Sequence, residues 1–345
     1  MLELWLLDDA RRDMSPEVIL RRRDSPWASY HSTISIVVTT FSVIRFHYLR
    51  TLFDSILRQN GADRLELVVV VEKDRGLAEC VKRYLESSSI HNCIVLYYPH
   101  LRGMSDARNK GAAESTSPMV AFVDDDVVLG PNWLESVIRG LGKPGVVAVT
   151  GPSSPLWTRA PRSVIPPEFS WLIGSTDYFI PPNNLRVRNV WGNNMAIRKD
   201  EFANIGGFSN DYGLHNAGRK RWFDPPSEDV DLSLRLGLRS GRELVYVPGM
   251  RVGHWVEGKK MTWPYIAQRS YSIGYQRRAI LVRYPNSAQG DPIRSEKHLA
   301  KRIMLLLPKL FMLFPTSPRL ALNLFALIVV VSLFSTLGFL DRRMY

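Results

Sequence analysis

The stretch "MVAFVDDDVVLGPNWL", residues 119–134, decides the fold because it places three consecutive aspartates directly behind a short apolar run. The run is typical of a buried strand. Asp124, Asp125 and Asp126 repel one another unless something neutralises their charge, and Mg²⁺ or Mn²⁺ bound to carboxylate oxygens and substrate phosphates would do so. The alternative is an Asp-rich turn that opens a helix, which we expect to begin near Pro131.

Strand and helix patterns alternate on both sides of this stretch. The apolar runs predict strands at 33–41, 65–72, 93–98 and 119–124, and amphipathic patterns predict helices at about 45–58, 76–87 and 105–116. Apolar strands joined in this way form a mostly parallel sheet with helices on both faces, which is an α/β fold. Ligands of such sheets bind beyond the carboxyl ends of the strands, where the aspartates are expected.

Other polar groups are expected at the same edge of the sheet. The loop after the first strand, with Thr39, Thr40 and Phe41, would line a nucleotide base through its backbone. Glu72 ends the second strand, and Arg108 lies on the helix that leads into the fourth strand, where a guanidinium pairs well with phosphate. Each signal alone is weak, but together they predict a nucleotide site.

The second half of the chain contains "PPSEDVDLSLRLGLRSGRELVYVPGMRVGHW", residues 225–255. Ser227 has the character of a helix N-cap, with Glu228 and Asp229 in the first turn. Plain capping explains these acids, because they complement the helix dipole. The same dipole keeps Asp229 ionised, as a general base requires. His254 follows a short strand and, judged alone, is more often structural than a ligand.

These motifs in this order resemble glycosyltransferase family 2, whose nucleotide-binding α/β domain is called GT-A. The motifs that carry the resemblance are "SIVVTTF", "GMSDARNKGAAES", "MVAFVDDDVVLGPNWL", "WGNNMAIRKDEFANIGGF", "SEDVDLSLRL" and "YVPGMRVGHW", over about residues 33–256. The resemblance implies that Asp124 and Asp126 bracket the Asp-x-Asp motif as metal ligands, with Asp126 the more direct one. It also implies that Asp125 lies near the ribose or the metal.

The resemblance assigns further roles to the second half. Asp229 would be the catalytic base, and His254 would complete the metal site or lie near the diphosphate. The wall between donor sugar and acceptor would be formed by Trp191, Gly192, Asn193 and Asn194, with Glu228 on the acceptor side. Arg108 would face the nucleotide or its phosphates.

Two stretches depart from the family pattern. The second strand is followed by Glu72-Lys73-Asp74-Arg75-Gly76 in place of an Asp-Asp-Gly-Ser-like turn, so Glu72 is the residue expected to contact the nucleotide base there. The first strand ends in Thr39-Thr40-Phe41-Ser42 in place of Pro-x-Tyr-Asn, which leaves mostly backbone contacts.

The distribution of charge points to a membrane rather than to nucleic acid. Residues 259–345 contain fourteen Lys or Arg and only three acids, so they account for nearly all of the formal net charge of +12. This basic stretch leads into residues 320–340, twenty-one residues without a charge, which are long enough to cross a bilayer. The alternative for 320–340 is a buried helix. The run 303–314 is shorter and suits a membrane interface.

The same features predict a location and a domain organisation. Basic residues before the anchor favour the cytosolic face of the membrane, and the N-terminus has no signal-peptide pattern. Cys80 and Cys93 give no disulfide framework. The expected segments are 1–32 as an extension, 33–150 for the nucleotide sugar, 151–290 for the acceptor and catalysis, 291–318 at the interface, and 319–345 as a transmembrane helix and tail.

The expected activity is inverting, metal-dependent transfer of a sugar from a UDP- or GDP-sugar to a hydroxyl of a lipid-linked glycan. A dolichyl- or polyprenyl-phosphate sugar synthase is the near alternative, since its acceptor is an anionic phosphate that needs no base. A sugar-nucleotide pyrophosphorylase and a non-catalytic membrane scaffold are more distant alternatives.

Overall fold

The computed structural model describes the chain at residues 15–23, 33–158, 165–176, 178–179, 183–210, 228–238, 241–285 and 294–341. Ser227, the expected N-cap, lies outside these residues. The strands, helices and contacts of the molecule are those of these described residues.

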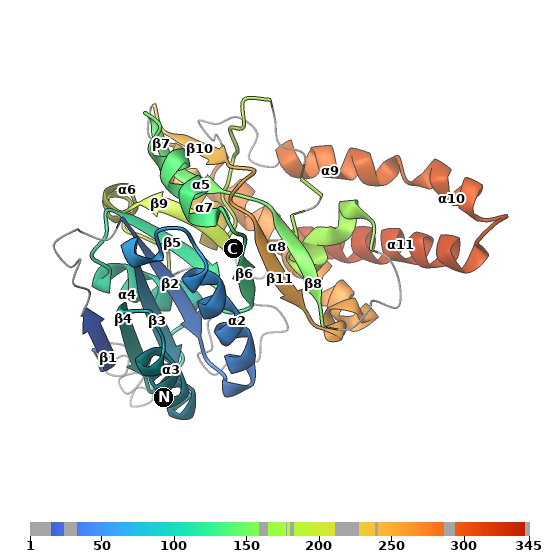
Figure 1. The fold of residues 1–345 in the computed structure, drawn as a ribbon. Helices are drawn as coiled ribbons and strands as arrows, with labels where there is room; N and C mark the ends of the chain where they lie inside the picture. The colour runs from blue at the N-terminus through green and yellow to red at the C-terminus, as the bar shows by residue number, and fades with distance from the viewer. Residues whose placement is uncertain are drawn as a thin grey trace, which may run out of the picture.

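A mixed eight-stranded sheet forms the centre of the molecule (Figure 1). Its strands are β1 (Glu17–Arg23), β2 (Ile34–Thr40), β3 (Leu65–Glu72), β4 (Asn92–Tyr98), β5 (Met119–Asp124), β7 (Val146–Thr150), β9 (Asn194–Arg198) and β10 (Glu243–Tyr246). They lie in the order β1-β4-β3-β2-β5-β9-β7-β10. The four strands expected from the sequence, β2 to β5, are parallel neighbours. Three strands of this sheet were not expected: β1 pairs antiparallel at the edge, β9 runs antiparallel beside β5, and β7 pairs with β9 and β10.

Helices cover both faces of the sheet because successive side chains of a strand point to opposite faces. The helices are α2 (Phe46–Leu57), α3 (Arg75–Ser87), α4 (Met104–Glu114), α5 (Trp133–Leu141), α6 (Lys199–Asn204) and α7 (Glu228–Gly237). On β2, Ile36 packs into the apolar cluster shared with α2, α3 and α5. Its neighbour Val37 packs into the cluster shared with α4, α6 and α7. The doubly covered α/β sheet predicted from the sequence is therefore confirmed.

A second, three-stranded sheet lies beyond the carboxyl end of β5. It consists of β6 (Val127–Leu129), β8 (Ser153–Trp157) and β11 (Val252–Val256). The central strand β11 is antiparallel to β6 and parallel to β8. Four short 3₁₀ helices connect the elements: η1 (Val43–Arg45), η2 (Ala62–Arg64), η3 (Pro167–Ile173) and η4 (Gly258–Met261). Because β6 begins directly after the aspartates, this small sheet brings β11 next to them.

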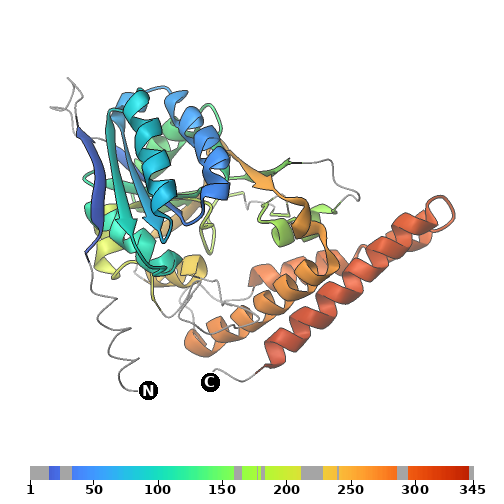
Figure 2. The same cartoon turned by 90° about the horizontal axis from the view of Figure 1, so that it is seen from below.

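The C-terminal helices are α8 (Trp263–Arg283), α9 (Arg294–Met304), α10 (Leu307–Leu313) and α11 (Pro318–Leu340). Figure 2 shows α11 beside α8 and reaching away from the sheet. The two helices are in close contact at two glycines. A Cβ added to Gly274 would lie 1.9 Å from the Ser335 carbonyl oxygen, and one added to Gly338 would lie 2.0 Å from the Tyr271 carbonyl oxygen. The glycines therefore allow the two backbones to pack closely.

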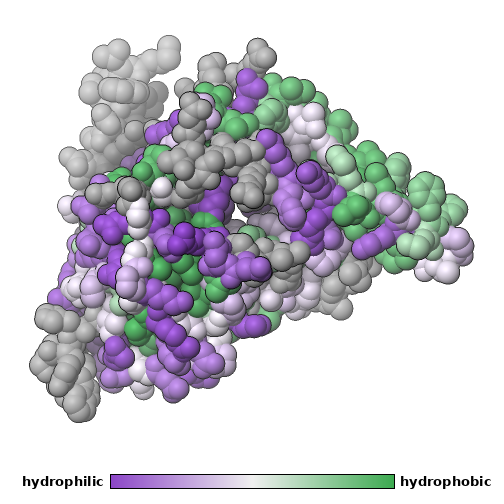
Figure 3. All heavy atoms as spheres, turned by 90° about the horizontal axis from the view of Figure 1, so that it is seen from above, coloured by the Kyte–Doolittle hydropathy of each residue, from purple (hydrophilic) through white to green (hydrophobic). Residues whose placement is uncertain are grey.

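The far end of these helices is apolar and exposed. Phe311 and Met312 of α10 are 82% and 71% exposed, and Figure 3 shows apolar surface at this end of the molecule. Among the described residues, α11 is the one helix that is long and apolar enough to cross a membrane. Its C-terminal half, however, also packs against α8, so this helix is both a candidate membrane anchor and a wall of the folded domain.

Candidate active site

The three aspartates lie at the end of β5 and in the tight turn that joins it to β6. Arg45, directly before α2, neutralises two of them: its guanidinium is 2.5 Å from Asp125 and 2.6 Å from Asp126. Thr40 donates a hydrogen bond of 2.7 Å to the Asp125 carboxylate. Asp125 and Asp126 are both buried, whereas the Asp124 side chain remains 35% exposed. Asp124 is thus the member of the run that faces open space.

Burial and neighbouring charges separate the two buried aspartates. Burial raises the pKa of Asp125 to about 7, although Arg45 and the Thr40 hydroxyl oppose the rise. For Asp126 burial acts in the same direction, but His254, Arg45 and Lys260 outweigh it and hold the pKa well below its ordinary range. Asp126 is therefore the permanently ionised member of the pair.

A divalent cation fits the donor types of this site. Asp126 Oδ1 is buried without a hydrogen bond, with His254 Nε2 3.4 Å away, and Asp124 lies on the open side of the same turn. In the described chain, however, no three His, Cys, Asp or Glu side chains are grouped closely enough to hold a metal ion. Arg45 explains this arrangement, because it draws Asp125 and Asp126 toward itself. The set Asp124, Asp126 and His254 stays a prediction.

Arg108 connects the two halves of the site. Its side chain, only 3% exposed, pairs with Glu228 at 2.9 Å and with Asp124 at 3.0 Å, and donates 3.1 Å to the carbonyl of Gly192. These contacts join α4, the aspartate turn, α7 and the segment before β9. Arg108 therefore holds the predicted donor and acceptor sides together, and its expected contact with a phosphate stays a prediction.

Asp229 lies in the first turn of α7, as the sequence predicts. Its Oδ2 accepts a 3.1 Å hydrogen bond from the Gly192 backbone N–H, and its Oδ1 accepts one of 2.8 Å from the N–H of Val230. These bonds fix the direction of the carboxylate, which lines the cavity described below. The geometry leaves the Asp229 carboxylate on the cavity wall, and its role as a catalytic base stays a prediction.

The segment expected to form the acceptor wall is divided between cavity and core. Trp191, Gly192 and Asn193 line the cavity. Asn194 does not: it is fully buried, accepting a 2.9 Å hydrogen bond from the Trp133 indole and donating one of 2.7 Å to the Met250 carbonyl. The expectation for Asn194 is therefore corrected, because its amide satisfies buried polar groups between strands.

The residues predicted to contact the base of the nucleotide also differ in exposure. Glu72 is buried, and its carboxylate accepts the backbone N–H groups of Arg102 and Gly103 before α4. Burial raises its pKa, against the effect of those two bonds. Glu72 therefore anchors the loop that leads into α4, and its contact with a nucleotide base stays a prediction. Phe41, by contrast, is 48% exposed beyond β2. With Thr39 and Thr40 before it, Phe41 stays a predicted nucleotide contact.

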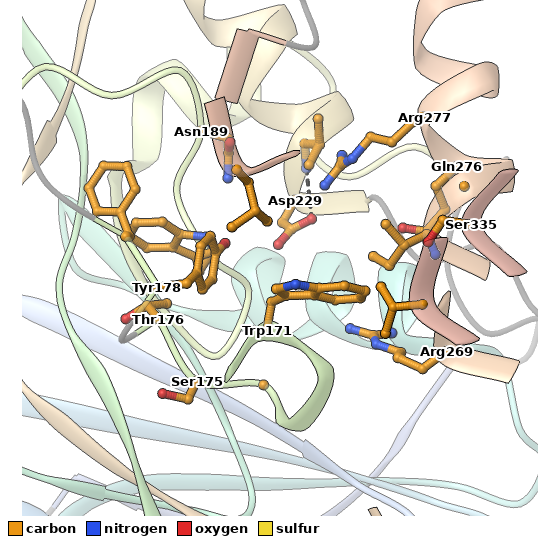
Figure 4. Close-up of a pocket in the computed structure, with 18 of the residues that line it drawn as sticks. Trp171, Ser175, Thr176, Tyr178, Asn189, Asp229, Arg269, Gln276, Arg277 and Ser335 are labelled. Carbon is orange, nitrogen blue, oxygen red and sulfur yellow. Dashed lines mark hydrogen bonds between the residues drawn. The ribbon is translucent and has the colours of Figure 1, made fainter. Parts of the chain in front are cut away.

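One cavity of about 950 Å³ joins the site to the C-terminal helices. It is lined at one end by Asp124, Arg108, Glu228, Asp229 and His254, and at the other by apolar residues of α9, α10 and α11. Figure 4 shows Trp171 in the middle of this group, between Asp229 and Arg269 in that view. The volume is at the upper end of small-molecule pockets, about 300–1,000 Å³.

Sequence reasoning missed several lining residues. Lys260 on η4 lies 3.5 Å from His254 Nε2, and burial lowers its pKa despite the nearby Asp126 and Asp124. Trp171, Arg269 and Arg277 also line the cavity. The two arginines belong to "AQRSYSIGYQRR", residues 267–278, in which only a basic and aromatic composition was evident. No local spacing showed that this helix returns to the aspartates.

Known proteins resemble this chain over the same region. Residues 35–204 match the model of the glycosyl transferase family 2. A glucosyl-dolichyl phosphate glucuronosyltransferase of Haloferax volcanii is 28% identical over 256 residues, which are 74% of this chain and 79% of that protein. A pre-mycofactocin glycosyltransferase of Mycobacterium tuberculosis is 30% identical over 195 residues, 56% of this chain but only 38% of that protein.

Two solved structures show the same fold. A mannosyltransferase from Pyrobaculum calidifontis, in complex with GDP-Man and Mn²⁺, superimposes with a TM-score of 0.59 at 17% identity, covering 97% of this chain and 94% of its own. GalNAc-T7 with UDP, GalNAc and Mn²⁺ gives a TM-score of 0.50 at 14% identity, covering 86% of this chain and 60% of its own. The family match favours a glycosyltransferase over the pyrophosphorylase and the scaffold. The chain therefore contains a glycosyl transferase family 2 domain within a GT-A fold, and it is a glycosyltransferase.

Proposed function

We propose that this chain transfers a sugar from a nucleoside diphosphate sugar to a hydroxyl of a lipid-linked saccharide, with inversion at the anomeric carbon. The observation that carries the proposal is the cavity, which is lined both by Asp124 and Asp229 and by apolar residues of α9 to α11. A UDP- or GDP-sugar would lie on the aspartate side, and the acceptor would enter between the helices. The name of the Haloferax volcanii relative supports a lipid-linked acceptor.

The chemistry is a single displacement. Asp229 takes the proton of the acceptor hydroxyl, whose oxygen forms the new bond to the anomeric carbon. The bond from that carbon to the diphosphate oxygen breaks, and its electron pair leaves with the nucleoside diphosphate. Attack from the opposite face inverts the configuration. The Gly192 N–H aims the Asp229 carboxylate for this step.

A bound Mn²⁺ or Mg²⁺ would supply positive charge to the departing diphosphate. Asp124, Asp126 and His254 would hold the ion, which requires Arg45 to release Asp126. Lys260 places its amino group on the same side of the cavity. Arg108 keeps Asp124 and Glu228 in place while the substrates bind.

The enzyme is proposed to act at a membrane surface. The exposed apolar residues of α10 and α11 would enter the lipid, and the basic residues of α9 would meet anionic head groups on the cytosolic face. This location would place the mouth of the cavity next to a lipid-linked acceptor.

A lipid-phosphate sugar synthase is the second candidate, because arginines line the same cavity as Asp229. In that reaction a phosphate oxygen attacks and no base is needed, so the fixed Asp229 carboxylate favours a hydroxyl acceptor.

One assay distinguishes the two reactions. The full chain in neutral detergent receives a panel of UDP- and GDP-sugars with Mn²⁺, and either farnesyl phosphate or glucosyl farnesyl phosphate as acceptor. We expect release of nucleoside diphosphate and a disaccharide product from the glucosylated lipid, with the inverted anomer by NMR. A sugar attached to the phosphate of farnesyl phosphate would instead identify a synthase, and no transfer to either lipid from any donor would contradict both.

A further inference from the structure

We propose that the middle of the cavity is a binding site for the phosphate of the acceptor's lipid carrier, formed by Arg269 and Arg277 of α8 with the Trp171 indole N–H. This inference rests on the proposed function and locates a second anion site, separate from the aspartate turn where the donor diphosphate is expected.

The polar groups of this site have the chemistry of a phosphate receptor. Both guanidinium groups line the cavity. In the described chain Arg269 forms no hydrogen bond or ion pair, and its Nε is shielded from solvent. The Trp171 Nε1, which can only donate, is also buried without a partner. Buried donors left unsatisfied are costly, so an acceptor-rich ligand at this point would stabilise them.

The charges around the cavity favour an anion in its middle. Of the three acids that line it, Asp124 and Glu228 are already paired with Arg108. Among the described acids that line the cavity, Asp229 is the one that does not pair with Arg108, whereas Arg269 and Arg277 both line the same cavity. The cavity therefore has a positive middle section between the predicted base and the C-terminal helices.

The walls beyond the arginines fit a hydrocarbon chain. Ile303 and Leu307 of α9 and α10, with Ile328, Val331 and Phe339 of α11, line the same cavity. Below Trp171, Phe169 and Leu172 pack into one apolar cluster with Leu327 and Ile328. These helices continue to the exposed apolar end, so a lipid tail held between them would run toward that end.

This order fixes how the acceptor lies. Its sugar hydroxyl faces Asp229, its phosphate meets the arginines, and its tail runs between α9, α10 and α11. Asp229, Arg277 and Trp171 appear together in Figure 4. The phosphate and the reacting hydroxyl therefore share one chamber, so the site suits a carrier bearing a short saccharide.

The test measures binding without any donor, so that it is independent of transfer. Calorimetry with the full chain in neutral detergent compares farnesyl phosphate, farnesol and inorganic phosphate. We expect farnesyl phosphate to bind at least tenfold more tightly than either of the others, and Arg269→Gln to remove this preference. Arg283→Gln is the matched control, because Arg283 lies on the same helix but is 42% exposed.

Three results would overturn the site: equal binding of farnesyl phosphate and farnesol, equal effects of the Arg269 and Arg283 variants, or inorganic phosphate binding as tightly as the lipid. A loss of sugar-nucleotide affinity in Arg269→Gln would also overturn it, since the arginine would then serve the donor. If binding behaves as expected but no sugar is transferred to glucosyl farnesyl phosphate, the site stands and the proposed function fails.

Discussion

Replacing Arg108 with methionine should destabilise the protein by about 3 kcal/mol, because the substitution removes the guanidinium that pairs with a buried carboxylate. The Glu228 side chain is only 7% exposed, and breaking a buried pair of this kind typically costs about 3–5 kcal/mol. Asp124 contributes less, because it is 35% exposed and water can replace the guanidinium; exposed pairs contribute about 0–1 kcal/mol. The lower end of the buried range is therefore expected.

The assay is urea unfolding of the full chain in neutral detergent. Arg139→Met is the matched control, because Arg139 also pairs with a glutamate but both side chains are more than 60% exposed, and it should lose less than about 1 kcal/mol. Adding Glu228→Leu to Arg108→Met should restore at least half of the loss, since the buried charge is then removed. An Arg108→Met protein within about 1 kcal/mol of the parent would refute the account of this network.

Further predictions concern packing, pH and the membrane. Gly274→Val should lower the melting temperature and loosen α11, because the valine side chain would collide with the Ser335 carbonyl. Gly258→Ala is the control and should be neutral, since a Cβ there has nothing within 4 Å. Equal melting temperatures of the two variants would contradict the packing of α11 against α8. Because burial raises the pKa of Asp125 to about 7, its protonation stabilises the fold below about pH 4 and this contribution fades as pH rises through 7. The stability difference between the parent and Asp125→Asn should shift over that range, and a pH-independent difference would count against the raised pKa. Ending the chain after Ser317 should release it from membranes on carbonate extraction, with weak, salt-sensitive binding left over; a resistant truncated chain would rule out α11 as the anchor.

The sequence predicted the parts of the fold that depend on local pattern. Apolar strands and amphipathic helices place β2 to β5 and α2 to α4 within a few residues, because burial sets their period. The edge strand β1 was not predicted, since its mixed basic sequence carries little pattern and its pairing with β4 is a long-range contact. Likewise, β9 runs antiparallel, a direction that its residues do not encode locally.

In the candidate site, the position of a residue along its strand or helix predicted where it lies, whereas contacts between distant segments of the chain could not be predicted. Asp124 and Asp229 lie on the cavity wall as their elements suggest. Arg45 could not be predicted, because an arginine before a helix is usually solvated and only folding brings it to Asp125 and Asp126. Asn194 shows the reverse error: a polar residue in a functional motif can satisfy buried hydrogen bonds instead.

The most direct test of the central claim separates chemistry from binding at Asp229. In Asp229→Asn the side chain keeps its shape and one oxygen acceptor for the Gly192 N–H, but it can no longer take a proton. Loss of a general base typically slows a reaction about a hundredfold to ten-thousandfold. We therefore expect near-parental sugar-nucleotide affinity by calorimetry and at least about a hundredfold slower single-turnover transfer to glucosyl farnesyl phosphate. Transfer within a few-fold of the parent enzyme would contradict the account and leave Asp229 as part of the helix terminus.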